Sequence, residues 1–304
     1  MARVRDDGLA ELLREVRRIE VQSRRLVAGA MAGGWRSVFR GAGLEFDELR
    51  EWADGDDPRA VDWNVTARMG RPFVRKYGEE RQLTVVFLLD LSASMDAGFG
   101  AWSARGAAAR AIACLALAAV GNNDKVGLVA CGRGIEKFVP PRRGAAHALS
   151  IVRDALALPA GGGATDLAAP LEFAARALRH GAVVFLLSDL LGEGWQGAAA
   201  RCARRHDLVA LRLEPPELDD PPFALLCARD PEGGAPLWLD GSAPRTRAEL
   251  AARATAWRVR TAADLRRAGA DLIELPVPRA RDTRAIARPI LKFFRMRELR
   301  GAKR

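Results

Sequence analysis

Five oxygen-bearing side chains, contributed by three separate segments, carry the chemistry that the sequence suggests. Asp90, Ser92 and Ser94 alternate directly after the apolar run TVVFLL. Thr165 lies in the loop GGGATD, and Asp189 closes the run AVVFLLSD. Two carboxylates and three hydroxyls, without histidine or cysteine, form a hard-oxygen set that suits Mg²⁺ or Mn²⁺. Because hydroxyl ligands are neutral, such an ion keeps positive charge and can bind a carboxylate from another protein.

These side chains need a scaffold that brings distant loops together. From residue 83 onward, continuous apolar runs alternate with helical patterns. Such strands, separated by amphipathic helices, predict a parallel sheet covered on both faces, that is, a doubly wound, mostly parallel α/β domain. Ligands of such sheets bind beyond the carboxyl ends of the strands, where the three loops would meet. The expected strands are residues 84–90, 125–132, 135–140, 182–189, 207–213 and 271–276.

The expected organisation is an N-terminal extension, residues 1–82, followed by the α/β domain, residues 83–304. The extension opens with apolar residues at helical spacing, which predicts an amphipathic helix. Within the α/β domain, a central Gly-Gly predicts an inserted hairpin near residues 223–240. A long helix is expected at residues 244–268, followed by a strand and a closing helix.

Composition narrows the possible partners. The 304 residues are 49% hydrophobic and carry a net charge of +10, so nucleic acid, anionic membranes and acidic proteins must all be considered as partners. The arginines are scattered along the chain with no interleaved aromatic stripe, which disfavours specific nucleic-acid binding. The closing helix mixes apolar and basic residues, and packing on the sheet is the commoner outcome for such a face than membrane contact.

The compartment expected from the sequence is the cytoplasm. The four cysteines lie far apart without a Cys-x-x-Cys pair, which is typical of reduced thiols. The chain shows no uninterrupted apolar run of membrane-spanning length, and its N-terminus lacks the apolar centre of a signal peptide. The cysteines are Cys114, Cys131, Cys202 and Cys227.

The segment DLSAS resembles the Asp-x-Ser-x-Ser signature of the metal-ion-dependent adhesion site in von Willebrand factor A domains. The resemblance implies that Ser92 and Ser94 bind the ion directly and that Thr165 binds it directly or through water. It implies that Asp90 and Asp189 act mainly through water and hydrogen bonds. The ion would then serve as a binding switch that recruits a partner's carboxylate, and the protein would not be an enzyme.

A second resemblance covers the segment from Gly43 to Glu80, which is similar to the signature of the family called domain of unknown function 58. This resemblance implies an action with a MoxR-type AAA+ ATPase in assembling or maturing other proteins. The residues that carry it are Glu45, Phe46, Arg50, Gly55, Asp56, Asp57, Arg59, Asp62, Trp63, Ala67 and Arg68.

The predicted function is a metal-dependent protein-interaction module whose partner is an AAA+ ATPase or a client protein. A metal-dependent phosphohydrolase that uses the same oxygen cluster is the alternative. No histidine falls in any of the three loops, so an obvious general base is missing from their sequence. A nucleic-acid-binding protein driven by net charge is the third reading.

Overall fold

The computed structural model describes residues 14–23, 49–53, 61–75, 82–98, 100–161, 166–179, 181–228 and 237–301. The chain divides into two compact units. The larger comprises Met1–Phe39 with Leu83–Arg304, and the smaller comprises Arg40–Gln82.

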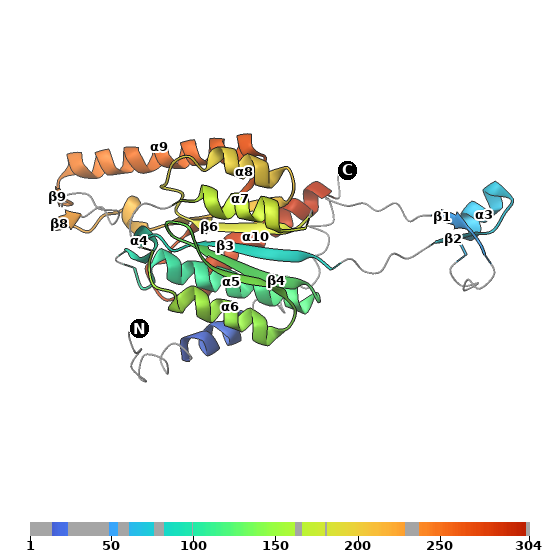
Figure 1. The fold of residues 1–304 in the computed structure, drawn as a ribbon. Helices are drawn as coiled ribbons and strands as arrows, with labels where there is room; N and C mark the ends of the chain where they lie inside the picture. The colour runs from blue at the N-terminus through green and yellow to red at the C-terminus, as the bar shows by residue number, and fades with distance from the viewer. Residues whose placement is uncertain are drawn as a thin grey trace. The chain divides into compact units, whose positions relative to one another are not determined.

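The larger unit contains a six-stranded sheet. Its strands are β3 (Thr84–Asp90), β4 (Lys125–Cys131), β5 (Ile135–Arg142), β6 (Val183–Ser188), β7 (Asp207–Glu214) and β10 (Asp271–Pro276). They lie in the order β10-β7-β6-β3-β4-β5. Adjacent strands from β10 to β4 run parallel, and β5 runs antiparallel to β4 at one edge. The mostly parallel α/β sheet expected from the sequence is therefore confirmed (Figure 1).

Helices cover both faces of this sheet (Figure 1). The helices on one face are α5 (Ala104–Gly121), α6 (Ala145–Ala157) and α10 (Thr283–Gly301). Those on the other face are α7 (Ala168–Ala177), α8 (Gln196–Ala203) and α9 (Pro244–Ala268). Each face therefore has its own hydrophobic core, and this explains why the strands read as continuous apolar runs.

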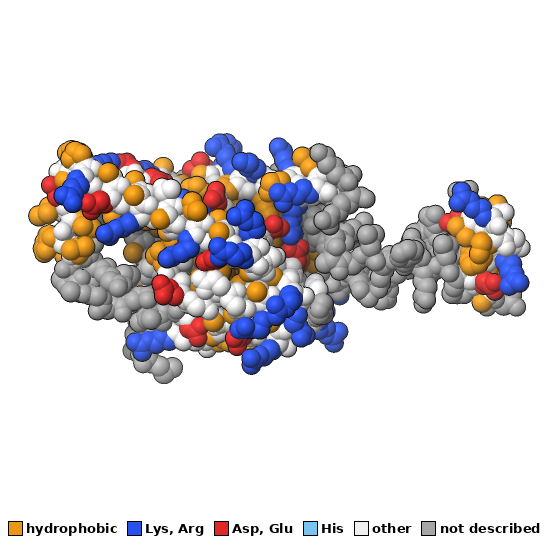
Figure 2. Space-filling view, turned by 90° about the horizontal axis from the view of Figure 1, so that it is seen from above, with side chains coloured by type: hydrophobic (Ala, Val, Ile, Leu, Met, Phe, Trp, Pro, Cys, Tyr) orange, Lys and Arg blue, Asp and Glu red, His pale blue; other side chains and the backbone are white. Residues whose placement is uncertain are grey.

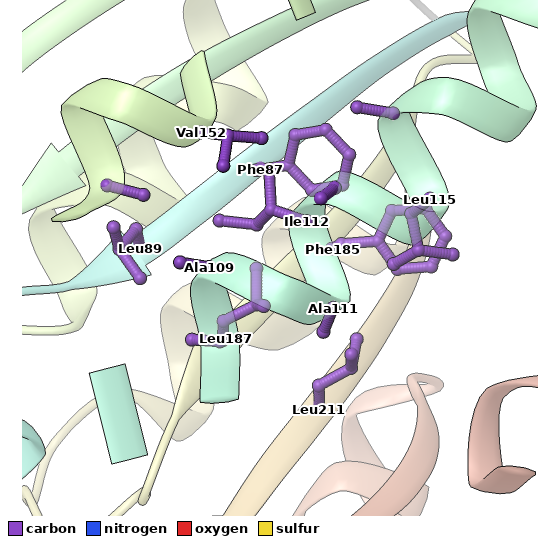
Figure 3. Close-up of a cluster of buried hydrophobic side chains, with 14 of the residues drawn as sticks. Phe87, Leu89, Ala109, Ala111, Ile112, Leu115, Val152, Phe185, Leu187 and Leu211 are labelled. Atoms are coloured by element: carbon purple, nitrogen blue, oxygen red, sulfur yellow. The ribbon is translucent and has the colours of Figure 1, made fainter. Parts of the chain in front are cut away.

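The core under α5 is built from large strand side chains and a small-residue helix. Phe87 and Phe185, from adjacent strands, stack with ring centroids 5.8 Å apart, and they lie close to Ile112 and Leu115 of α5 (Figure 3). Ser103 caps this helix by accepting a 3.1 Å hydrogen bond from Gly106 N. Within the described residues, α5 is the one helix long and apolar enough to cross a membrane, but 78% of it is buried inside the protein.

The helix of residues 14–23 packs on the same face as α5. Ile19 is fully buried in the core, and Glu15 forms an ion pair with Arg110 of α5. The thiol of Cys114 donates a 3.4 Å hydrogen bond to the hydroxyl of Ser23. This part of the N-terminal extension therefore contributes to the core of the α/β unit.

A buried arginine joins α9 to the two strands beneath it. Arg212 of β7 is fully buried, and it donates hydrogen bonds to Glu214 at 2.7 Å and to Glu274 of β10 at 2.8 Å. It also donates at 2.6 Å to Thr261 Oγ1 of α9 and lies 4.9 Å from the ring centroid of Trp257. Its Nε donates a 2.9 Å hydrogen bond to Glu214 Oε1, so all three guanidinium nitrogens have partners, as a buried charge requires.

Shorter elements surround the carboxyl edge of the sheet. They are α4 (Ala93–Asp96), the 3₁₀ helix η3 (Pro216–Leu218), β8 (Leu225–Ala228) and β9 (Leu237–Asp240). Strands β8 and β9 pair antiparallel in the segment where the hairpin is expected.

The described residues of the smaller unit form a two-stranded antiparallel sheet and a short helix. Asp62 caps the helix, because its Oδ1 accepts a 3.2 Å hydrogen bond from Val65 N. Most of the remaining signature residues of this segment lie outside the described residues. The elements are β1 (Leu49–Glu51), α3 (Trp63–Met69) and β2 (Phe73–Arg75).

Candidate metal site at the carboxyl edge of the sheet

Asp90 is the last residue of the central strand β3, and its side chain is held from two sides. It is 1% exposed. Its Oδ1 accepts a 2.7 Å hydrogen bond from Ser92 N, and its Oδ2 accepts a 2.6 Å hydrogen bond from Ser188 Oγ. Ser188 ends the neighbouring strand β6 and in turn accepts a 2.9 Å hydrogen bond from Leu190 N. The carboxylate is therefore fixed in orientation before any ligand arrives.

Ser92 and Ser94 present their hydroxyls together, as the sequence predicts. Their Oγ atoms lie 3.0 Å apart. Ser92 is buried and precedes the one-turn helix α4, which contains the half-buried Ser94. The turn after β3 thus directs two alternate hydroxyls to the same side, next to the carboxylate of Asp90.

Asp189 follows β6 and is 4% exposed. Its Oδ1 accepts a 3.1 Å hydrogen bond from Leu191 N, across Leu190, whose φ of 56° lies in the left-handed region. Burial, and then the negative charge of Asp189, raise the pKa of Asp90 to about 6, against the hydrogen bonds from Ser188 and Ser92. The two carboxylates are therefore close enough to repel each other, and a cation between them would relieve that repulsion.

The third loop approaches the same place through its glycines. Gly161 forms a parallel bridge with Ser92 and donates a 2.7 Å hydrogen bond to the carbonyl of Leu91. A Cβ added to Gly161 would lie 2.8 Å from Cα of Gly132 and 2.6 Å from Oε1 of Glu136. Glycine is required at position 161 because its backbone lies against the backbone of Gly132, in the turn after β4.

The predicted ligand of this loop, Thr165, lies outside the described residues. Its neighbour Asp166 acts as a helix cap: its Oδ1 accepts hydrogen bonds from Ala168 N at 2.9 Å and from Ala169 N at 3.1 Å. Asp166 is therefore engaged by the start of α7.

The donor set fits a hard divalent cation. The structure brings Asp90, Ser92 and Ser94 together, and it places Asp189 near Asp90 at the same edge. Among the described residues, no group of three or more His, Cys, Asp and Glu side chains is arranged to hold a metal ion, so serine hydroxyls must complete any ligand set here. Hydroxyl and carboxylate oxygens are ligands for Mg²⁺ or Mn²⁺.

Ser188 is a residue of this site to which sequence reasoning assigned no role. The sequence places Ser188 directly before the predicted ligand Asp189, but this position does not show which side chain Ser188 contacts. Only the parallel register of the two strands, with Leu89 opposite Leu187, places Ser188 beside Asp90. The sequence alone does not give that strand order.

The chain is 30% identical over 274 residues to uncharacterized proteins of Mycobacterium bovis and Mycobacterium tuberculosis, which covers 88% of this chain and 86% of each relative. Similar solved structures include BatB, a conserved hypothetical protein of Bacteroides thetaiotaomicron (19% identity, TM-score 0.44, 70% of this chain and 99% of that chain). They also include the SpRpn10 VWA domain (13% identity, TM-score 0.38, 69% of this chain and 94% of that chain).

A family model described as "Protein of unknown function DUF58" matches residues 48–260. This match spans all of the smaller unit's described residues and the sheet through β7. The resemblance to the domain of unknown function 58 family is thereby confirmed, and the sheet has the mostly parallel α/β arrangement expected from the sequence. The chain belongs to the family described as "Protein of unknown function DUF58".

Proposed function

We propose that this chain is a protein-interaction module that binds Mg²⁺ or Mn²⁺ at the carboxyl edge of its sheet and, through the ion, an acidic residue of a partner protein. The observation that carries the proposal is the convergence of Asp90, Ser92, Ser94 and Asp189 beyond two adjacent strands. An interaction role also agrees with the resemblance of the segment DLSAS to the adhesion site of von Willebrand factor A domains.

Each residue would have a distinct task. Ser92 and Ser94 would hold the ion through neutral oxygens, with Thr165 as a further ligand. Asp90, oriented by Ser188, and Asp189 would supply the negative charge that holds the cation at this edge. When bound, the ion would offer an open coordination position to an outside carboxylate.

The partner we propose is a MoxR-type AAA+ ATPase, or a client protein that the two handle together during assembly or maturation. Support for this partner comes from the family resemblance alone. The site chemistry adds one requirement, which is that the partner present an accessible Asp or Glu.

A metal-dependent phosphohydrolase is the weaker candidate. Two of the three histidines lie at the amino edge of the sheet: His147 Nε2 is 3.0 Å from the carbonyl oxygen of Val126, and His206 Nε2 is 3.1 Å from that of Ala174. The third, His180, lies outside the described residues. Within the described part of the chain, no histidine stands beside the site to act as a general base.

Partner binding in the presence and absence of the ion tests the proposal. The purified full chain would be immobilised and exposed to the MoxR-type ATPase of its own organism with Mg²⁺ or with EDTA. Asp90→Asn is expected to abolish the Mg²⁺-dependent binding, whereas Asp207→Asn, at the opposite end of the sheet, is expected to retain it. Binding that is equal in EDTA and in Mg²⁺ would contradict the proposal, and Mg²⁺-dependent phosphoester turnover that Asp189→Ala abolishes would favour the hydrolase.

A further inference from the structure

A pocket opens at the carboxyl edge of the sheet, between η3, the start of α9 and the loop after β10. Its volume is about 420 Å³, within the range of roughly 300–1,000 Å³ that is usual for ligand sites. The lining combines apolar and charged groups and includes Gly100, Glu217, Asp220, Phe223, Arg247 and Arg279.

The pocket shares a wall with the loop that follows the metal-site serines. Gly100, six residues after Ser94, is part of its lining. A Cβ added to Gly98 would lie 3.8 Å from Oε1 of Glu217, and Ala101 N donates a 3.2 Å hydrogen bond to the carbonyl of Arg279. The loop that follows Ser94 therefore forms one border of the pocket.

An exposed apolar surface lies on the other side of the pocket. Phe223 is at the rim and 79% exposed, with the guanidinium carbon of Arg247 6.0 Å from its ring centroid. On the following hairpin, Leu225 is 67% exposed and Trp238 is 64% exposed. Trp238 pairs with Cys227, which is two positions after Leu225, so Leu225, Cys227 and Trp238 lie on one face of the hairpin. Figure 2 shows hydrophobic side chains gathered at this end of the α/β unit.

The charges around this surface are paired with each other. Asp220 forms ion pairs with Arg247 at 2.5 Å and with Arg279 at 2.6 Å, and Asp219 forms one with Arg258 at 2.7 Å. An anionic membrane would favour a surplus of basic groups beside the apolar residues. An apolar centre with a charge-paired polar rim is instead the composition of a protein-protein interface.

We propose that the pocket together with Phe223, Leu225 and Trp238, here called the hairpin surface, binds the bulky apolar residues that flank the partner's acidic residue. This inference rests on the proposed function and extends it, because it defines the partner's determinant as an Asp or Glu with apolar neighbours. The ion supplies attraction for the carboxylate, and the hairpin surface supplies apolar burial and selectivity.

A random twelve-residue peptide library displayed on phage tests this inference without a known partner. Phage are selected on the immobilised full chain in Mn²⁺ and eluted with EDTA. The eluted peptides are expected to share one acidic residue next to Leu, Ile, Phe or Trp. Synthetic copies are then titrated against variants of the hairpin surface.

Phe223→Ser and Trp238→Ser are each expected to lower the affinity for these peptides about tenfold or more, since truncating an apolar anchor has that effect at interfaces. Mn²⁺ affinity is expected to stay at the wild-type value in both variants. Matched controls are Val259→Ser and Leu299→Ser, each 66% exposed and placed on helices elsewhere; they are expected to leave peptide affinity unchanged.

The outcomes separate the two proposals. If the selected acidic peptides show no apolar enrichment and bind equally to Trp238→Ser and the wild type, the role of the hairpin surface is contradicted while the metal-dependent function stands. A failure of EDTA to elute any peptide would overturn the proposed function itself. Trp238-dependent binding to vesicles with anionic lipid, or Trp238-dependent dimerisation of the chain in light scattering, would assign the surface to a membrane or to a second copy and overturn the inference.

Discussion

The hydroxyl of Ser188 lies 2.6 Å from Oδ2 of Asp90 and joins the ends of two adjacent parallel strands. Ser188 is fully buried, so water does not replace this hydrogen bond. A buried carboxylate with a partner on each oxygen has one orientation, and that orientation faces the paired hydroxyls of Ser92 and Ser94. Much of the site's preorganisation thus comes from a residue outside the predicted ligand set.

Ser188→Ala is expected to weaken Mn²⁺ binding about tenfold, because it leaves one oxygen of Asp90 without its buried donor. Isothermal titration calorimetry measures the affinity, and thermal unfolding measures stability separately. The matched control is Ser150→Ala, which removes a hydroxyl bonded to the carbonyl of His147 in α6. Equal Mn²⁺ affinity in Ser188→Ala and the wild type would show that Ser188 does not position the site.

Asp90→Asn is expected to stabilise the metal-free protein while abolishing metal binding. A shift of the Asp90 pKa from 3.8 to about 6 corresponds to about 3 kcal/mol of unfavourable free energy for the ionised form at neutral pH. The amide keeps an acceptor for Ser92 N and removes the repulsion from Asp189. Denaturant unfolding in EDTA at pH 7 is the measurement.

Metal should reverse that order of stability. Saturating Mg²⁺ is expected to stabilise the wild type and leave Asp90→Asn unchanged, since only binding to the native state adds free energy of unfolding. If Asp90→Asn is markedly less stable than the wild type in EDTA, burial and the charge of Asp189 do not destabilise the ionised carboxylate of Asp90.

Gly161→Ala is expected to lower both stability and metal affinity, because its Cβ would meet the backbone of Gly132 at 2.8 Å. The bridge between Gly161 and Ser92 would shift with it. Gly134→Ala serves as the control, since a Cβ there would meet nothing within 4 Å. Thermal unfolding and Mn²⁺ titration of the two variants would show equal values if close loop contact were unimportant.

Arg212→Ala is expected to cost about 3–5 kcal/mol of unfolding free energy, as removing one partner of a buried ion pair does. Arg212→Met fills most of the volume and is expected to cost less. Arg245→Ala is the control: Arg245 is an exposed arginine paired with Glu249, and its loss is expected to change stability by less than about 1 kcal/mol. Urea titration compares the unfolding free energies of the three variants. A loss for Arg212→Ala as small as that for Arg245→Ala would show that Arg212 does not hold α9 to the sheet.

The sequence predicted the sheet well because both of its faces are buried. Val86 and Phe87 of β3 enter different cores, so the central strands β3 and β6 are apolar between their first and last residues and are easily recognised. The long helix α9 was predicted with its observed bounds, since Pro244 begins it and Gly269 ends it.

Other features depend on distances that no local pattern encodes. Asp90 and Ser188 are 98 positions apart, and their contact follows from β6 being placed next to β3. The pocket likewise combines Gly100, Glu217 and Arg279. Thr165 stays a prediction, because its position lies outside the described residues.

Titration of the full chain with Mn²⁺ by isothermal titration calorimetry is the decisive test of a metal site at the carboxyl edge of the sheet. The wild type is expected to bind one Mn²⁺ per chain in competition with Mg²⁺; Asp90→Ala and Ser92→Ala are each expected to abolish this binding, and Asp207→Asn is expected to retain it. Absence of saturable binding by the wild type, or binding that survives both Asp90→Ala and Ser92→Ala, would contradict the proposed metal site.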